Sequence, residues 1–163
     1  MLFADQPSRW QGWRIDILGT DISGRAIEAA RGGVYTQFEI QRGLGVSQML
    51  RWFTETPEGW RPRPELRRPI RFERRNVLDA PPDPGRFDLV LCRNVLLYFA
   101  AENRTKAFDR LATATAHDGW LMIGAGETVT GQSDEFVPAC NTSGLYRRGP
   151  SALPTSVARS GRR

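Results

Sequence analysis

Polar residues follow three stretches of the sequence that the pattern of apolar residues predicts to be strands. They are Asp21, Asn76 and Asn94. In an α/β sheet, ligands bind beyond the carboxyl ends of the strands. We therefore expect these side chains to contribute to one ligand site.

Their chemistry suits a ligand that contains a ribose and an adenine. A carboxylate such as that of Asp21 can accept hydrogen bonds from both ribose hydroxyls. Asn76 and a backbone amide can bind the edge of an adenine, whereas Val77 and Leu78 can cover its face. The third position, at Asn94, is expected nearest the reacting centre.

Each of these residues also has a purely structural interpretation. An aspartate after a strand is more often a helix cap than a ribose ligand, and Asn76 can simply end its strand. The order and spacing of the positions together favour the functional interpretation. The sequence has no GxGxxG after a predicted strand, which argues against a dinucleotide-binding enzyme such as a dehydrogenase.

The segments that must position these residues alternate between strand and helix patterns. Strands are predicted over 14–20 and 70–75, and the continuous apolar run 87–92 is typical of a parallel strand buried on both faces. Helices are predicted in three places, namely after Ser23, over 47–53 and from residue 101. This alternation predicts an α/β domain with a mostly parallel sheet.

The remaining segments predict smaller features. Proline and glycine between aromatic and basic residues predict hairpin-like strands over about 54–70. A second parallel strand is expected at 119–127, followed by an antiparallel hairpin formed by 136–140 and 144–149. Residues 149–163 are small, polar and proline-containing, and they predict a disordered tail after a domain at 1–148.

The net charge of +5 permits several classes of partner, because basic proteins bind nucleic acid, anionic membranes or acidic proteins. No recognised nucleic-acid-binding module accompanies the charge, so nucleic acid is the weakest of the three. No apolar run approaches the roughly 20 residues that span a bilayer, so we expect a cytoplasmic protein. One histidine and two cysteines argue against a protein-built zinc site.

Longer segments resemble the chemotaxis receptor methyltransferase (CheR) family, over about residues 12–148. The most specific is FDLVLCRNVLLYF, residues 87–99; the others are ILGTDISGRAIEAARGGVY, VYTQFEIQRGL, ELRRPIRFERRNVLDAPPDPGR and GWLMIGAGET. The resemblance implies a Rossmann-like class I methyltransferase sheet with helices on both faces. It also implies a small antiparallel β subdomain, inserted at about 54–70.

The family transfers a methyl group from S-adenosylmethionine to glutamates on the cytoplasmic helices of methyl-accepting chemoreceptors. A glutamate carboxylate is already ionised at neutral pH, since its reference pKa is about 4.3, so catalysis by positioning suffices. The resemblance implies cofactor-binding roles for Asp21, Ile22, Asn76, Val77, Leu78 and Asn94. It implies catalytic roles at the reacting centre for Arg93, Asn94 and Tyr98, with the Tyr98 hydroxyl beside the substrate carboxylate. Phe99 is interpreted as a core residue.

The sequence departs from the family in two respects. The family's first strand and its glycine-containing loop have no counterpart, which implies two unpaired strand edges and a tendency to self-associate. An alternative function is therefore a non-catalytic receptor-binding or regulatory fragment. Residues 124–128 read GAGET where many members have a GHSE-like sequence, and Glu127 is at least as well interpreted as a solvated loop carboxylate.

The arginines of the inserted segment have two equally supported interpretations. They are Arg61, Arg63, Arg67 and Arg68. They can meet the acidic surface of a receptor's helical bundle, or they can form a solvated face without a partner.

Overall fold

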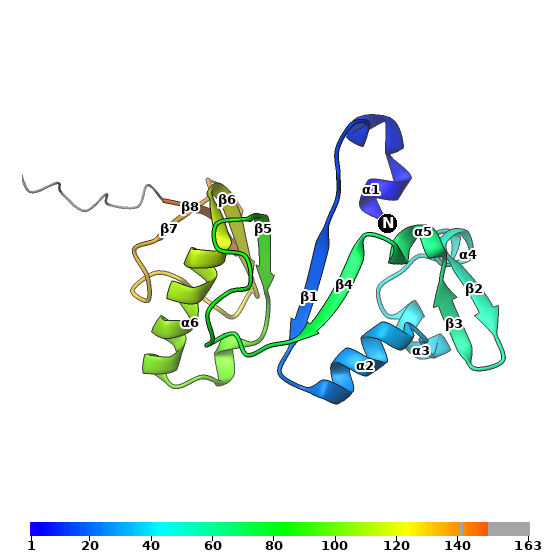
Figure 1. Ribbon diagram of the computed structural model, residues 1–163, viewed down its shortest axis with the longest axis horizontal. Coiled ribbons are helices and arrows are strands. Elements are labelled where there is room, and N and C mark those ends of the chain that lie inside the picture. Colours follow the sequence, from blue (N-terminus) through cyan, green and yellow to red (C-terminus); the bar gives the residue numbers. More distant parts are fainter. Residues whose placement is uncertain (141, 150–163) are drawn as a thin grey trace, which may run out of the picture. The chain divides into compact units, whose positions relative to one another are not determined.

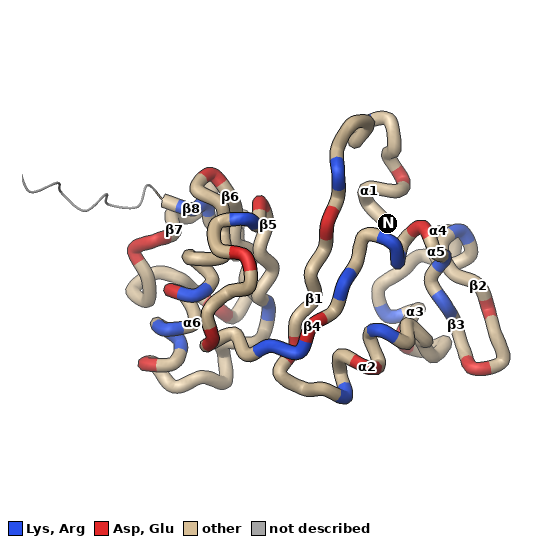
Figure 2. The backbone as a smooth tube through the Cα atoms, viewed as in Figure 1, with Lys and Arg blue, Asp and Glu red and all other residues tan. Residues whose placement is uncertain are grey.

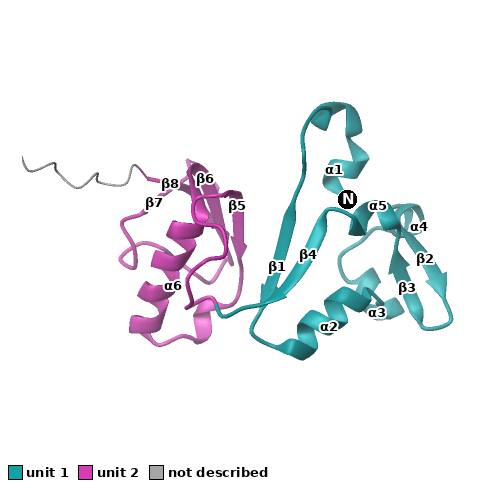
Figure 3. Cartoon of the chain, viewed as in Figure 1, with its two compact units in different colours: residues 1–76 teal, residues 77–163 magenta. Residues whose placement is uncertain are grey.

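The computed structural model describes residues 1–140 and 142–149 and shows two compact units (Figure 1). Unit 1 comprises residues 1–76 and unit 2 begins at Val77 (Figure 3). Both units combine helices with strands, and each contains one pair of parallel strands, so the predicted α/β class is confirmed. The predicted tail, apart from Gly149, lies outside the described residues.

Unit 1 contains a parallel pair of strands and an antiparallel pair. Strand β1 pairs with β4 in parallel, from Ile17↔Ile70 to Asp21↔Arg74, so their carboxyl ends lie at the same edge. Strands β2 and β3 form an antiparallel hairpin within the segment assigned to a small subdomain. In chain order, the elements are α1 (Leu2–Asp5), η1 (Pro7–Trp10), β1 (Ile17–Asp21), α2 (Gly24–Gly32), α3 (Gln37–Gln41), α4 (Val46–Trp52), β2 (Phe53–Thr56), β3 (Gly59–Pro62), α5 (Pro64–Arg67) and β4 (Ile70–Arg74).

Helix α2 begins and ends where the sequence predicts. The Ser23 hydroxyl accepts a hydrogen bond from the Ala26 N–H, which satisfies one of the free donors of the first turn. Gly33 ends the helix with a φ of 62°, a conformation that glycine adopts without steric cost. Ile27 is the buried residue of this helix. Helix α4, by contrast, begins at Val46 after Gly45, one residue before the start of the helix predicted over 47–53.

A small core joins the hairpin to the helices that precede it. Its buried residues are Ile40, Met49 and Trp60. The Trp60 indole N–H donates to the Gln37 side-chain oxygen, and the Trp60 backbone pairs with Tyr35. The hairpin therefore packs on α3 and α4 by side-chain contacts, and a backbone bridge joins it to the segment just before α3.

Unit 2 is built on a mixed sheet of four strands in the order β5-β6-β8-β7. Strand β5 runs parallel to β6, and β8 lies antiparallel to both β6 and β7, which confirms the predicted final hairpin. Its elements are β5 (Phe87–Cys92), η2 (Leu96–Tyr98), α6 (Ala101–Ala114), β6 (Thr115–Ile123), β7 (Phe136–Pro138) and β8 (Leu145–Arg148).

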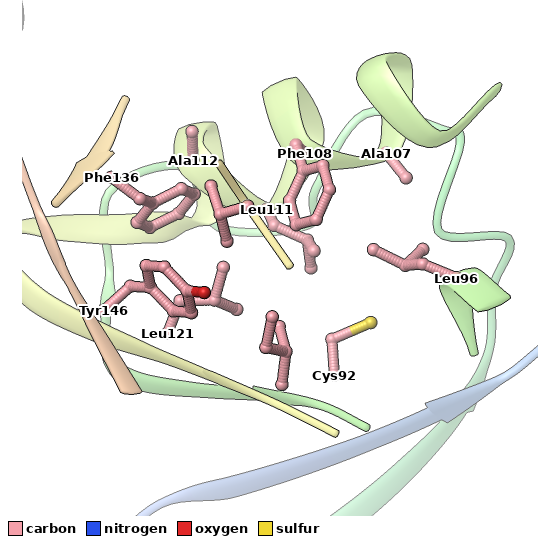
Figure 4. Close-up of a cluster of buried hydrophobic side chains, with 11 residues drawn as sticks. Cys92, Leu96, Ala107, Phe108, Leu111, Ala112, Leu121, Phe136 and Tyr146 are labelled. Carbon is pink, nitrogen blue, oxygen red and sulfur yellow. The ribbon is translucent and has the colours of Figure 1, made fainter. Parts of the chain in front are cut away.

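Helix α6 packs on one face of this sheet and forms the core of unit 2 with it (Figure 4). The helical periodicity predicts Ala107, Phe108, Leu111 and Ala114 on the inner side, and all four are buried. From the sheet, Leu121 and Ile123 are almost completely enclosed. Side chains of α6 and of the sheet therefore form most of this core.

Strand β5 departs from the prediction that it is buried on both faces. Cys92 faces the core, whereas Leu89 and Leu91 are 53% and 63% exposed. The physical reason is that side chains alternate along a strand and α6 covers only one face of this sheet. Among the described residues β5 pairs with β6 alone, and β1 pairs with β4 alone. Each of these two strands thus has one edge that pairs with no other strand of the described residues.

Candidate functional site

The first group of predicted site residues lies at the carboxyl end of the β1–β4 pair in unit 1. The Asp21 backbone carbonyl accepts a hydrogen bond from the Arg75 N–H at 2.9 Å. The Arg74 guanidinium donates to the Ile22 carbonyl oxygen at 3.0 Å. These two bonds tie the end of β1 to the end of β4, one or two residues before Asn76. Asp21, Ile22 and Asn76 therefore share one strand end, as predicted.

The Asp21 side chain is exposed at this strand end and is partly engaged. Its Oδ1 accepts the Ser23 N–H at 2.7 Å, so the aspartate helps to start α2, which is the structural interpretation. Its second carboxylate oxygen accepts no hydrogen bond from the described residues, so that oxygen is available to a ligand. The two interpretations are thus compatible, because one oxygen orients the carboxylate and the other can accept a hydroxyl.

The second group lies in unit 2, in the loop that follows β5. Asn94 is exposed and has a φ of 58°, a left-handed conformation that asparagine tolerates better than most residues. Val77 and Leu78 are half-buried and pack against the core of unit 2. Arg93 is exposed beside Asn94. The residues predicted to cover an adenine are thus held by the same core that supports β5.

Tyr98 and Phe99 differ in the way the sequence predicts. Tyr98 ends the short helix η2 and is 84% exposed, so it is not a core aromatic residue. Phe99 is half-buried and packs against the core of unit 2. Two residues before Tyr98, Leu96 is only 1% exposed and anchors the loop in that core.

Glu127 is the residue of this region that the sequence interpretation undervalued. Its carboxylate accepts hydrogen bonds from four backbone N–H groups, at distances between 2.7 and 3.1 Å. Three of the donors belong to the loop after β5 and the fourth to the loop after β6; they are Asn94, Val95, Leu96 and Gly124. The only signal in the sequence is a glutamate three residues after the glycine that follows a strand. This pattern does not reveal hydrogen-bond partners more than thirty residues away.

The electrostatics of the loop follow from these bonds. Partial burial by itself raises the pKa of Glu127, but the four backbone hydrogen bonds outweigh it and leave the pKa below its ordinary value. Burial, and to a smaller extent the charge of Glu127, raise the pKa of the Cys92 thiol to about 11. Glu127 is therefore an anion and Cys92 a neutral thiol at neutral pH. Cys140, by contrast, is exposed.

The described part of the chain lacks two other functional features. It holds no group of three or more histidine, cysteine, aspartate or glutamate side chains arranged to bind a metal ion. None of its helices has both the length and the apolar character that crossing a membrane requires.

Comparison with known proteins identifies the family. Residues 1–144 match the model of the CheR methyltransferase SAM-binding domain. The chain belongs to the CheR methyltransferase family. A chemotaxis protein methyltransferase of Vibrio parahaemolyticus is 33% identical over 135 residues, which are 82% of this chain and 49% of that protein. Chemotaxis protein methyltransferase 1 of Pseudomonas aeruginosa has the same identity and the same coverage.

The chain is also similar to one part of a much larger protein. An uncharacterised 104.1 kDa protein of Rhodobacter capsulatus is 33% identical over 163 residues, which are 99% of this chain and 17% of that protein. Among solved structures, the [4+2]-cyclase SpnF matches with a TM-score of 0.44 and 15% identity, over 73% of this chain and 34% of the cyclase. The chain spans about half the length of the curated chemotaxis methyltransferases it matches.

S-adenosylmethionine is the cofactor of this domain family. The residue types at the strand ends match the chemical groups of this cofactor. Asp21 offers an oriented carboxylate oxygen for a ribose hydroxyl, and Asn76 stands at the same strand end. Val77 and Leu78 offer half-buried apolar side chains. These residues of the CheR domain are divided between the two units, so their assembly into one site with Asn94 stays a prediction.

Proposed function

We propose that this chain forms the cofactor-binding part of a methyltransferase that modifies glutamate side chains of chemoreceptors. The observation that carries the proposal is the presence of exposed polar side chains at the carboxyl ends of parallel strands, with Asp21 as the last residue of β1 and Asn94 in the loop after β5. The match to the CheR domain supports this interpretation. Because the substrate helices of chemoreceptors are cytoplasmic, the proposal places the protein in the cytoplasm.

The chemistry asks for little beyond alignment. The cofactor, when bound, supplies an activated methyl group on a positively charged sulfur. The acceptor glutamate is ionised at neutral pH, so the chain needs no general base. The proposed roles of its residues are to hold the ribose through Asp21, to line the reacting centre with Asn94, and to orient the acceptor carboxylate through the exposed hydroxyl of Tyr98.

The arginines of the β3–α5 segment are the proposed contact for an acidic receptor surface (Figure 2). Two of the four have partners within unit 1, because Arg67 donates to the Arg31 carbonyl oxygen at 2.6 Å and Arg61 lies 4.0 Å from Glu58. Arg63 and Arg68 are exposed and form no ion pair with the described residues. These two are the arginines most available to an incoming acidic helix, where long-range attraction raises the association rate.

Calorimetric titration with S-adenosylhomocysteine, the product of the reaction, tests the cofactor site. We expect micromolar binding to the 163-residue chain, and a loss of roughly tenfold in affinity for Asp21→Asn, because one charged acceptor of a ribose hydroxyl is removed. Asp134→Asn, an exposed turn residue in unit 2, is the matched control with the same change in charge.

The outcomes separate the proposal from its alternative. Equal affinities of the parent and Asp21→Asn would refute the ribose assignment. No binding to the parent chain would favour a non-catalytic fragment that contacts the receptor through its arginines.

Tyr98→Phe tests the step that follows binding. Because the hydroxyl is proposed to touch the acceptor and not the cofactor, we expect unchanged affinity for S-adenosylhomocysteine together with methyl transfer to receptor slowed by roughly tenfold or more. Incorporation of labelled methyl groups into receptor-containing membranes measures the rate. A parallel loss of both affinity and rate would contradict the assigned role.

A further inference from the structure

We propose that Glu127 is a positioning residue for the methyl transfer, because its carboxylate fixes the backbone that presents Asn94 and Tyr98. The proposal rests on the proposed function, since it concerns the same site. Glu127 itself does not touch the reacting groups; it acts through the loop between β5 and α6.

The geometry of the carboxylate is the first argument. Its Oε2 accepts the N–H groups of Asn94 at 2.8 Å and Gly124 at 2.7 Å. Its Oε1 accepts those of Val95 at 3.1 Å and Leu96 at 2.8 Å. One side chain from the loop after β6 thereby satisfies three successive backbone donors of the loop after β5. Hydrogen bonds of this kind to an ionised acceptor are stronger than neutral ones.

The conformation of the loop explains why it needs an anion. Asn94 has a φ of 58°, and a left-handed residue turns successive N–H groups toward one point, which creates a concave site for negative charge. Without Glu127 these N–H groups would converge with no acceptor, and the backbone would lose the partner that stabilises an unfavourable φ. The carboxylate and the backbone conformation therefore depend on each other.

Gly124 provides an independent sign that the arrangement is close-fitting. A Cβ built at this position would lie 2.8 Å from Glu127 Oε2 and 3.0 Å from the Asn94 backbone nitrogen, and it would collide with the Asn94 side-chain oxygen. These distances are shorter than, or at the limit of, ordinary contacts of a Cβ atom. A side chain at residue 124 would therefore push the two loops apart, which makes glycine a requirement of this contact.

Glu127 is connected to the predicted site residues Asn94 and Tyr98 through a short segment of backbone. The Leu96 N–H donates one of the four hydrogen bonds, and the Leu96 side chain is buried in the core, whereas Tyr98, two residues later, is 84% exposed. The direction in which Tyr98 leaves the surface is set by η2, and η2 begins at Leu96. Asn94 precedes η2 and is held directly by Glu127. Both predicted site residues thus take their orientation from the segment that Glu127 binds.

The experiment compares Glu127→Gln with Glu102→Gln in the 163-residue chain. Glutamine has the same shape but places an NH₂ group against backbone donors, whereas Glu102 is exposed on the first turn of α6 and controls for the change in charge. Amide hydrogen exchange is measured at residues 94–96 and 124, with Leu111 and Leu121 as core references. Affinity for S-adenosylhomocysteine is measured by calorimetry.

For Glu127→Gln we expect exchange at the four loop amides to accelerate at least tenfold, while the core amides stay protected, and affinity to fall about tenfold. Glu102→Gln leaves both readouts unchanged. Glu127→Asp keeps the charge but is one methylene shorter, and we expect it to restore part of the affinity. It also serves as the milder variant where Glu127→Gln does not fold.

Three results would overturn the proposal. Unchanged exchange at residues 94–96 would show that Glu127 does not fix the loop. Accelerated exchange with unchanged affinity would leave Glu127 a structural role only. Absence of binding to the parent chain would refute the proposed function itself, and the exchange data would still report whether the loop depends on Glu127.

Discussion

The two parallel strand pairs of this chain have the same local topology but very different support. In β1 and β4 no residue is buried, and the helix that packs beside them, α2, buries Ile27 alone. In the β5–β6 pair, Cys92, Leu121 and Ile123 are enclosed by α6. The β5–β6 pair of unit 2 is thus packed against an extensive core, whereas the β1–β4 pair of unit 1 is packed against almost none.

The ends of the two pairs are held differently as well. At the end of β1–β4, the backbone is joined by the Asp21–Arg75 hydrogen bond and by the Arg74 side chain. At the end of β5–β6, the Glu127 carboxylate binds four N–H groups across two loops. Since polar groups bind ligands best when they are already oriented, the comparison predicts that Asn94 is better preorganised than Asp21.

Truncation of one core residue in each unit tests the difference in core support between the two strand pairs and should give the largest effect. Phe108 is fully buried, and we expect Phe108→Ala to lower the free energy of unfolding of unit 2 by about 3–5 kcal/mol. Ile27→Ala should cost less, about 2 kcal/mol, because the side chain removed is smaller and Ile27 is the one residue that α2 buries. Urea unfolding followed by amide signals from each unit measures both changes. Equal losses would show that the β1–β4 pair rests on a core as extensive as that of unit 2.

Acidification distinguishes the two strand ends. The folded-state pKa of Glu127 lies below its ordinary value, so its stabilising effect is complete above the ordinary glutamate range and is lost as the pH falls through the lowered pKa. The Cys92 thiol, with its pKa of about 11, stays neutral throughout this range.

We therefore expect the Asn94 and Gly124 amide signals to shift in NMR titrations at a pH below the ordinary glutamate pKa. The Arg75 N–H, which is bound to a backbone carbonyl, should not follow the same curve. Midpoints at the ordinary glutamate value would contradict the role of the four hydrogen bonds.

The smallest expected effect concerns the start of α2. Removal of the Ser23 hydroxyl by Ser23→Ala should cost about 1 kcal/mol, confined to unit 1, because the Ala26 N–H loses its acceptor. Ser23→Gly should cost only a few tenths of a kcal/mol, since glycine is tolerated at this position. Thermal unfolding monitored by circular dichroism ranks the two variants; a larger loss for glycine would mean that the cap contributes little.

Local patterns in the sequence predict the limits of helices and strands more reliably than they predict which other elements pack against them. The limits of α2 follow from a serine and a glycine, and the buried side of α6 follows from helical spacing, because both are set by residues close in sequence. The burial of β5 was predicted wrongly because a continuous apolar run does not reveal which of its faces another element covers. The start of α4 was misplaced by one residue because glycine, too, can precede a helix.

The candidate site shows the same limit. Asp21 and Asn76 lie at the same strand end, as predicted, because the alternation of strands and helices favours parallel pairing and parallel strands end at the same edge. Glu127 was undervalued because its four partners come mainly from a loop more than thirty residues earlier, and no local pattern encodes that contact. Interactions that depend on the closing of two distant loops become visible only when the fold is known.

The contrast between the two cysteines has a practical consequence for spectroscopy. Cys92 is enclosed and its thiol is neutral, whereas Cys140 is exposed, two residues after the end of β7. Only the thiolate attacks alkylating reagents, so a maleimide dye or nitroxide should attach to Cys140 and leave Cys92 untouched under native conditions. The natural sequence thus carries one selective attachment point, from which a second label introduced in unit 1 would allow distances across the chain to be followed.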